Sequence, residues 1–242
     1  MRHVDPGYEP ALSGNSGWNR ASQRRRAAES GALAAIGTVL RRAAKDTIFW
    51  ERDPADHVYQ LIRGSVCLYK LLPDGRRQVA RFCHAGDLVG LTGDSWYPYT
   101  ADALTEVSVV RIRRADLEAR MESERDLRRL VLHAIGEELS LAQNQLLLLG
   151  RKSAAERVAS FFRAMMEQAV RDGGDGRSVT LPMTRVDIAD FLGLTHETVC
   201  RAIGTLKSQG IIATPDPHRV EICAPEALEE IAEGDVPEKL CA

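Results

Sequence analysis

The sequence predicts an α+β protein with an N-terminal antiparallel β-roll, a long dimerisation helix and a C-terminal winged helix-turn-helix. Three observations lead to this fold class. Short alternating runs of apolar and polar residues, separated by turn residues, occupy 44–113. A regular apolar stripe follows in a helical segment that ends near Gly150. Two short amphipathic helices joined by a glycine then occupy 184–210, and a hairpin comes directly after them.

The predicted organisation has five parts. They are a disordered arm, the roll, the dimerisation helix, the winged helix-turn-helix domain and an acidic tail, over residues 1–30, 31–113, 114–150, 151–232 and 233–242. The arm is rich in Gly, Ser, Arg and Pro and has few large apolar residues, a composition typical of segments without a core. A short helix is expected at 33–40, and the tail is expected to be frayed after Glu229.

Length and composition are those of an ordinary globular protein. The 242 residues carry a net charge of −2, which argues against a protein that coats nucleic acid without sequence preference. No apolar run is long enough to span a bilayer and no secretory signal is visible, so a cytoplasmic protein without membrane contact is expected. The five cysteines are scattered without a CxxC pair, which disfavours a disulfide framework and cysteine-bound metal.

The roll is predicted from its turns as much as from its strands. Runs such as HVYQLIRGSVCLYKLL alternate in polarity, as expected of half-buried strands. Turn residues break these runs at Asp53–Pro54, Arg63–Gly64, Pro73–Gly75 and Ala85–Asp87.

The helix over 114–150 carries an apolar stripe whose members are separated by 3, 4, 3, 4 and 3 positions. This is the a/d repeat of a coiled coil. Its members are Leu132, Ile135, Leu139, Ala142, Leu146 and Leu149. Such a stripe could pack on its own domain, but its length and regularity favour pairing with a second copy, so a homodimer is expected. A further helix is predicted over 153–171, and a short strand over 178–181.

The segment TRVDIADFLGLTHETVCRAIGTLKSQG has the features of a helix-turn-helix. Thr184 is an N-cap residue with Asp187 as its capping partner, Gly193 supplies the turn, and Thr195 caps the second helix. In that second helix Val199, Ala202, Ile203 and Leu206 recur at helical spacing and are expected to face the core. The runs 211–214 and 219–222 form a hairpin beside it, the wing.

The opposite face of the second helix carries Glu197, Cys200 and Arg201. Arginine can contact guanine O6 and N7 with both arms of its guanidinium, and glutamate can accept a hydrogen bond from cytosine N4. A helix that presents both near its N-terminus suits base edges in a major groove. The alternative interpretation is an αα corner with a solvated polar face.

The order of elements and three motifs resemble the Crp/Fnr family of bacterial transcription regulators over roughly residues 33–232. The motifs are GDLVG (Gly86–Gly90), LLLLGRKSAAERVASFF (Leu146–Phe162) and VTLPMTRVDIADFLGLTHETVCRAI from Val179. The last is most similar to the FixK-like branch. The resemblance implies a cyclic-nucleotide-binding-like roll and a homodimer that binds double-stranded DNA. It also implies an activator of low-oxygen or redox-responsive genes, with RNA polymerase as a further partner.

The family pattern implies roles for individual residues. Glu197 and Arg201 fall on the positions that read a G·C pair in TTGAT- or TTGAC-like half-sites, one helical turn apart in an inverted repeat. His196 stands where the cyclic-AMP branch carries an arginine, so it joins the expected base-reading set. The residues expected to hold phosphates are Thr184, Arg185, Thr195 and Thr198.

Cys200 departs from the family pattern, because the family carries serine there. A thiol near a helix N-terminus and beside Arg201 favours the reactive thiolate. One hypothesis is therefore a redox switch, in which oxidised Cys200 prevents DNA binding. The other is a passive serine-to-cysteine replacement.

The sequence gives no support for a cofactor, a metal or catalysis. Residues 1–66 contain no cysteine, which rules out an iron–sulfur cluster of the Fnr type. In 91–103, Tyr99 stands where a cyclic-AMP regulator needs its phosphate-binding arginine, although Thr100 supplies a hydroxyl and Trp96 and Tyr97 could line a different pocket. Two alternatives stay open: an effector-gated regulator of the same fold, and a metal-dependent roll enzyme with an appended DNA domain.

The effector in the first alternative could be a small molecule or haem. His57, His84 and His133 are the histidines considered as haem ligands, and each is isolated in the sequence. The enzyme alternative lacks a His-x-His pair with a following glutamate, a nucleophile–base arrangement and a phosphate loop. The protein is therefore not expected to be an enzyme.

Overall fold

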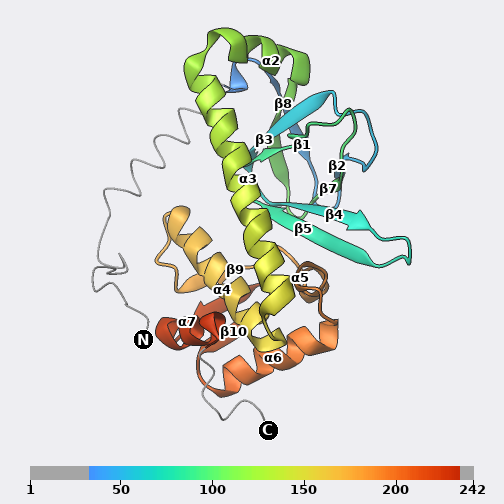
Figure 1. The fold of residues 1–242 in the computed structure, drawn as a ribbon. Coiled ribbons are helices and arrows are strands. Elements are labelled where there is room, and N and C mark those ends of the chain that lie inside the picture. Colours follow the sequence, from blue (N-terminus) through green and yellow to red (C-terminus); the bar gives the residue numbers. More distant parts are fainter. Residues whose placement is uncertain (1–32, 235–242) are drawn as a thin grey trace, which may run out of the picture.

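The computed structural model describes residues 33–234, so the arm predicted over 1–30 and most of the predicted tail lie outside the described residues. Figure 1 shows one long helix, α3 (Arg125–Arg151), running from beside a β-roll to a second, mainly helical unit. The roll precedes α3 in the sequence and the second unit follows it. This is the predicted order of roll, long helix and winged helix-turn-helix.

The roll consists of two antiparallel sheets. Their strand orders are β1-β8-β3-β6 and β2-β7-β4-β5. The strands are β1 (Thr38–Arg42), β2 (Thr47–Phe49), β3 (His57–Arg63), β4 (Val66–Leu71), β5 (Arg77–Cys83), β6 (Leu88–Val89), β7 (Thr100–Ala103) and β8 (Val107–Arg113). The prediction of an antiparallel roll is confirmed.

The helix predicted over 33–40 is wrong in its second half, because β1 begins at Thr38 and pairs with β8. Gly37 explains the close approach: a Cβ atom there would lie 2.4 Å from Val110 Cγ1 and 2.8 Å from the Arg111 carbonyl oxygen. Only glycine lets the chain enter the sheet at this distance. The β-branched pair Thr38–Val39 then continues as a strand.

The single helix predicted over 114–150 is divided into α2 (Arg114–Ser123) and α3 at Glu124, whose backbone is extended. Leu117 of α2 and Leu127 of α3 are buried in the same apolar cluster, so the bend lets both helices cover the roll. Arg128 stabilises the bend by donating to the Met121 and Glu122 carbonyl oxygens at the end of α2.

The second unit contains four helices and a three-stranded sheet of order β10-β11-β9. Its elements are α4 (Ala154–Arg171), β9 (Ser178–Thr180), α5 (Arg185–Leu192), α6 (His196–Ser208), β10 (Ile212–Asp216), β11 (Arg219–Ile222) and α7 (Pro225–Glu233). The predicted helix-turn-helix is α5–α6, and the predicted wing is β10–β11.

The tail predicted to fray after Glu229 is wrong as far as Glu233, because α7 continues to that residue. Pro225 lies in its first turn, where the missing amide proton costs nothing. Leu228, Ile231 and Ala232 are buried in the apolar core of this unit. The acidic residues between them lie on the solvent side. In the sequence they obscure the apolar periodicity of this helix.

No helix of the described residues is both long and apolar enough to cross a membrane.

Candidate nucleic-acid interface

The first helix of the helix-turn-helix is fixed by a capping box. Thr184 Oγ1 accepts from the Asp187 amide at 3.2 Å, and Asp187 Oδ2 accepts from the Thr184 amide at 2.8 Å. Both bonds satisfy amide groups that a helix start leaves unpaired. The predicted N-cap at Thr184 and its partner Asp187 are confirmed.

The turn to the next helix requires glycine. Gly193 has φ 61° and ψ 39°, a left-handed conformation that residues with a Cβ atom rarely adopt. Thr195 then caps α6, accepting from the Thr198 amide at 3.2 Å. Val199, Ile203 and Leu206 are buried and hold α6 against the rest of the unit. Ala202, the fourth residue predicted for this face, is half-buried against the same core. The predicted turn and cap are confirmed, and so is the buried face at three of its four residues.

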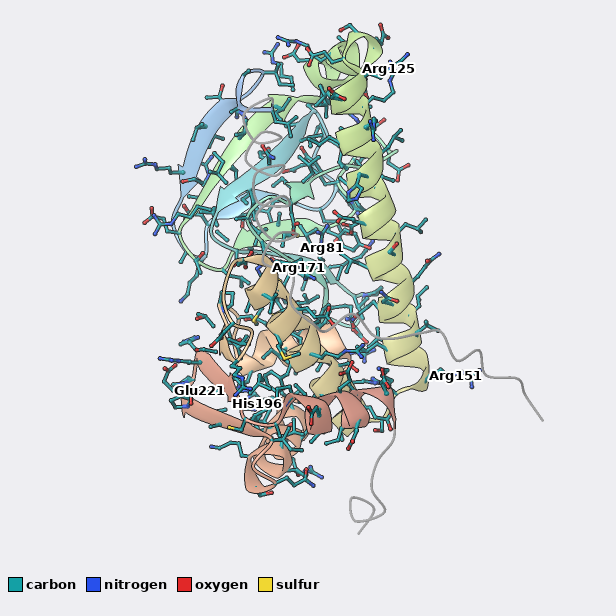
Figure 2. The ribbon with its side chains drawn as sticks, turned by 90° about the vertical axis from the view of Figure 1, so that its left-hand side faces the viewer. Arg81, Arg125, Arg151, Arg171, His196 and Glu221 are labelled. Atoms are coloured by element: carbon teal, nitrogen blue, oxygen red, sulfur yellow. The ribbon has the colours of Figure 1, made fainter. Side chains whose placement is uncertain are left out.

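The four residues predicted to read bases all lie exposed on α6: His196, Glu197, Cys200 and Arg201. Because His196 and Cys200 are one turn apart, His196 Nε2 lies 3.5 Å from Cys200 Sγ. Figure 2 shows His196 on the second unit, at the opposite end of α3 from Arg125. The structure therefore places the four residues predicted to read bases together on one solvent-facing side of an anchored helix.

The N-terminal end of α6 favours negative charge. The pKa of Glu197 is lowered, mainly by its own backbone amide and also by the Thr195 hydroxyl. Free amide groups and the helix dipole stabilise an anion at this end of a helix. Glu197 is therefore an acceptor at neutral pH, as contact with cytosine N4 requires.

The four residues predicted to hold phosphates begin the two helices: Thr184, Arg185, Thr195 and Thr198. Arg185 Nη1 is buried and has no hydrogen-bond partner among residues 33–234, so a phosphate can reach it only if the side chain moves. Burial lowers the pKa of Arg185, and the nearby Cys200 sulfur opposes that shift. The Thr184 hydroxyl already donates to Asp187 Oδ2 at 2.7 Å, so a phosphate would compete for that proton.

The acidic side chains of α5 are turned toward the roll and paired there. Arg77 of β5 donates to Asp187 Oδ1 at 2.5 Å and lies 3.4 Å from Asp190 Oδ2. Burial would raise the pKa of Asp187, but hydrogen bonds from Arg77 and Thr184 outweigh burial and lower it. Two carboxylates that would repel DNA are thus neutralised by an arginine far away in the sequence.

Most of the a/d stripe of α3 is exposed in the part of the chain that the structure describes. Leu132, Ile135, Leu139 and Leu146 are 60%, 48%, 59% and 72% exposed, and Ala142 is exposed as well. Leu149 is partly covered and lies against Gly193. The alternative that this stripe packs on its own domain is wrong for its exposed members. A contiguous apolar strip of this kind marks an interaction surface.

Comparisons with known proteins match both halves of this architecture. A cyclic nucleotide-binding domain model matches residues 39–124, and a Crp-like helix-turn-helix domain model matches 156–231. The nitrogen fixation regulation protein FixK of Azorhizobium caulinodans is 41% identical over 82% of this chain and 81% of its own. The chain belongs to the Crp/Fnr family.

Two further relatives place this Crp/Fnr chain in the FixK-like branch. The transcriptional activatory protein AadR of Rhodopseudomonas palustris is 40% identical over 80% of each chain. The solved structure of FixK2 from Bradyrhizobium japonicum has a TM-score of 0.76 and 35% identity, and it covers 81% of this chain and 97% of that one. The fold class is confirmed, and the chain is a DNA-binding transcription regulator.

The interior of the regulator's roll is filled by its own aromatic side chains. Phe49 stacks on Tyr97 with ring centroids 3.9 Å apart, and on Tyr59 at 5.5 Å. The Tyr97 hydroxyl donates to the His57 carbonyl oxygen, and Thr100 Oγ1 accepts from the Glu51 amide. Tyr97 is thus a core residue. Trp96 is exposed beside an open hollow of about 510 Å³ on the surface.

The histidines weighed as haem ligands lie on separate elements. His57 begins β3, His84 follows β5, and His133 lies on α3, 3.6 Å from Glu137. Within residues 33–234 no three metal-ligating side chains come together. Cys67 and Cys83 are buried, and burial raises the pKa of Cys67 to about 12. They are core thiols, as predicted.

Sequence reasoning missed Arg77, Gln78, Gln145 and Arg157, which join α5 to other parts of the molecule. Each is a polar residue on an otherwise ordinary strand or helix face. Nothing local distinguishes them, because their partners on α5 lie between 35 and 113 positions away.

Proposed function

We propose that this regulator binds, as a homodimer, an inverted repeat of TTGA-type half-sites and activates genes that respond to low oxygen or redox state. The observation that carries this proposal is the exposed set His196, Glu197, Cys200 and Arg201 on the anchored helix α6. Relatives bear names of the same kind: AadR is a transcriptional activatory protein, and FixK regulates nitrogen fixation.

Dimerisation follows from the exposed stripe on α3. Pairing Leu132, Leu139 and Leu146 with their copies removes apolar area from water, which is the main driving force for coiled-coil association. A two-fold axis along this stripe relates the two α6 helices by symmetry. A dimer with two-fold symmetry requires an inverted repeat, with half-site centres about one helical turn, or roughly 34–36 Å, apart.

Sequence is read at the exposed face of α6. Arg201 contacts guanine O6 and N7, and Glu197 accepts from cytosine N4 of the same base pair; each good contact is worth about 1–3 kcal/mol of discrimination. Arg185, Thr195 and Thr198 hold phosphates and fix the register without reading sequence.

Cys200 makes this binding sensitive to redox state. Its thiol is exposed on the face proposed to read bases, and its Sγ lies 3.5 Å from His196 Nε2. Oxidation to a sulfenic or sulfinic acid places a polar or anionic group against the DNA. An anionic group on the Cys200 sulfur then repels the negatively charged duplex.

RNA polymerase is the remaining partner in the proposal, since activation requires its recruitment. This partner rests on the family and on no particular contact of the described residues.

The direct test is binding to a TTGAT-N4-ATCAA duplex and to scrambled and half-site duplexes, followed by fluorescence anisotropy at fixed salt. The expected result is a dimer that binds the inverted repeat at least about 1,000-fold more tightly than the scrambled duplex. A monomer in sedimentation, or equal affinity for all three duplexes under reducing conditions, contradicts the proposal.

A further inference from the structure

The C-terminal end of α5 is held from three sides. A helix leaves its last four carbonyl groups without partners inside the helix. In α5 the first of them, Ala189, accepts from the backbone amides of the turn. The next three accept from side chains of three different elements.

Each of these side-chain bonds is short. Gln78 Nε2 of β5 donates to the Asp190 carbonyl oxygen at 2.7 Å, and Gln145 Nε2 of α3 donates to the Phe191 carbonyl oxygen at 2.7 Å. Arg157 of α4 donates to the Leu192 carbonyl oxygen at 3.0 Å. We call these three donors, Gln78, Gln145 and Arg157, the α5 collar.

Arg157 also binds the helix that carries the dimer stripe. Its Nη2 donates to the Leu149 carbonyl oxygen at 2.9 Å and its Nε to the Lys152 carbonyl oxygen at 2.9 Å. One guanidinium therefore joins the C-terminal end of α3 to the C-terminal end of α5. A cation suits this place, because both helix ends present partial negative charge.

The roll contributes more than one bond. Arg77, next to Gln78, pairs with Asp187 and Asp190, and its guanidinium lies 4.3 Å from the centre of the Tyr69 ring. Phe82 of the same strand lies 5.2 Å from Phe191, measured between ring centroids. Buried residues of the roll and of the helix-turn-helix thus share one apolar cluster.

The strand that makes these contacts is β5, at the edge of its sheet. An exposed edge strand is normally blunted or covered, because its free amides and carbonyls invite pairing. In this protein α5 packs against that edge strand. The contact between roll and helix-turn-helix thus anchors the helix to the edge of the sheet.

We propose that the α5 collar positions the recognition helix, so that the roll sets the spacing of half-sites that this dimer accepts. The inference rests on the proposed function. α6 follows α5 through a three-residue turn and packs on it, so an α5 fixed to β5, α3 and α4 also fixes the angle between α6 and the dimer axis. The roll is thereby a structural support for DNA reading.

The preference of the dimer for one spacer length distinguishes a loss of α6 positioning from a loss of fold stability. One added base pair between half-sites rotates the second by roughly 34–36° and moves it by about 3.4 Å. A dimer with rigidly placed α6 helices rejects that change, and a dimer with loosened helices tolerates it. A change in fold stability alone lowers the active fraction equally for both duplexes.

The experiment measures the ratio of affinities for duplexes with four-base and five-base spacers, using wild type, Gln78→Ala and Gln145→Ala. Each variant is expected to lower the ratio about fivefold, the factor that corresponds to one lost neutral hydrogen bond. Arg76→Ala is the matched control, because Arg76 lies in the same hairpin, is exposed and pairs only with Asp74 among the described residues. It should keep the wild-type ratio.

A second measurement needs no DNA. In both collar variants, hydrogen exchange of the α5 amides is expected to be faster than in wild type and Arg76→Ala, because the helix end is released. An unchanged spacer ratio and unchanged exchange in folded Gln78→Ala and Gln145→Ala overturn the inference. A wild type that binds no inverted repeat overturns the proposed function instead, and the exchange result then decides the inference alone.

Discussion

Glu197 and Arg201 are one helical turn apart on the exposed face of α6, where an acceptor and a forked cation can contact both bases of one G·C pair. Their backbone is held by Val199 and Ile203, which are buried. The neighbouring carboxylates of α5 are paired with Arg77 and do not cancel the charge of Arg201. This separation of charges allows a chain of net charge −2 to present a cation to DNA.

Arg201→Ala should remove discrimination at one base pair and leave nonspecific binding intact. The affinity for the TTGAT inverted repeat is expected to fall by about 1–3 kcal/mol for each half-site. Anisotropy titrations compare the natural duplex with one in which the G·C pair is replaced by A·T. Lys207→Ala, in the last turn of α6, is the control and should preserve the preference for G·C. Undiminished G·C preference in Arg201→Ala would refute the assigned role.

Cys200→Ser should make DNA binding resistant to peroxide. Cys200 and Cys223 are both exposed, whereas burial raises the pKa of Cys67 to about 12 and protects it from reaction. Peroxide is expected to weaken DNA binding by wild type. Dithiothreitol is expected to restore binding where oxidation has stopped at the sulfenic acid, since thiols do not reduce a sulfinic acid. Cys223→Ser is the matched control and should remain sensitive. Equal peroxide responses of wild type and Cys200→Ser mean that Cys200 is a passive replacement.

At the scale of elements, features that depend on neighbouring residues could be predicted from the sequence, and contacts between distant residues could not. The caps at Thr184 and Thr195 follow from residues three positions apart, so the sequence alone locates both helices. The break at Glu124 escaped prediction because no glycine or proline marks it, and Arg128 stabilises it by bonds that the pattern does not encode. The pairing of Arg77 with Asp187 joins residues 110 positions apart and has no local signature.

The capping box of α5 should give the fold a specific pH dependence. Burial would raise the pKa of Asp187, but bonds from Arg77 and Thr184 hold it below the ordinary 3.8. A carboxyl with a lowered folded-state pKa stabilises the fold above its unfolded-state pKa and loses that effect as pH falls through the folded value. Asp187→Asn is therefore expected to cost about 1–3 kcal/mol at pH 7, and the cost should shrink below about pH 4.

Urea unfolding of wild type and Asp187→Asn from pH 7 to pH 3 measures this difference. Burial raises the pKa of the neighbouring Asp190, so Asp190 affects the pH dependence of the free energy of unfolding with the opposite sign. The difference between wild type and Asp187→Asn isolates the effect of Asp187, because Asp190 is present in both proteins. A difference that is absent at pH 7, or that is equally large at pH 3, contradicts the assignment.

The whole molecule is a reading unit and a support joined by α3. Figure 1 shows α3 passing beside the roll and ending next to the helix-turn-helix. One side of α3 is occupied within the chain: Glu138 pairs with Arg81 of the roll, and Gln145 binds α5. The a/d stripe on another side is exposed at four of its leucine and isoleucine positions within residues 33–234. The same helix can therefore fix the roll, the DNA-reading unit and a second copy relative to one another.

Leu139→Glu should convert the regulator into a monomer that no longer binds the inverted repeat tightly. Leu139 lies at the middle of the stripe and is 59% exposed, so a glutamate is solvated in the monomer but faces its like-charged copy in a dimer. Leu147→Glu is the matched control, because Leu147 is 63% exposed but lies outside the a/d positions. Sedimentation equilibrium and anisotropy are expected to give a monomer with near-nonspecific affinity for Leu139→Glu and a dimer with wild-type affinity for Leu147→Glu. A dimeric Leu139→Glu would place the two-fold axis elsewhere, and α3 would then lose its role in setting the distance between the two α6 helices.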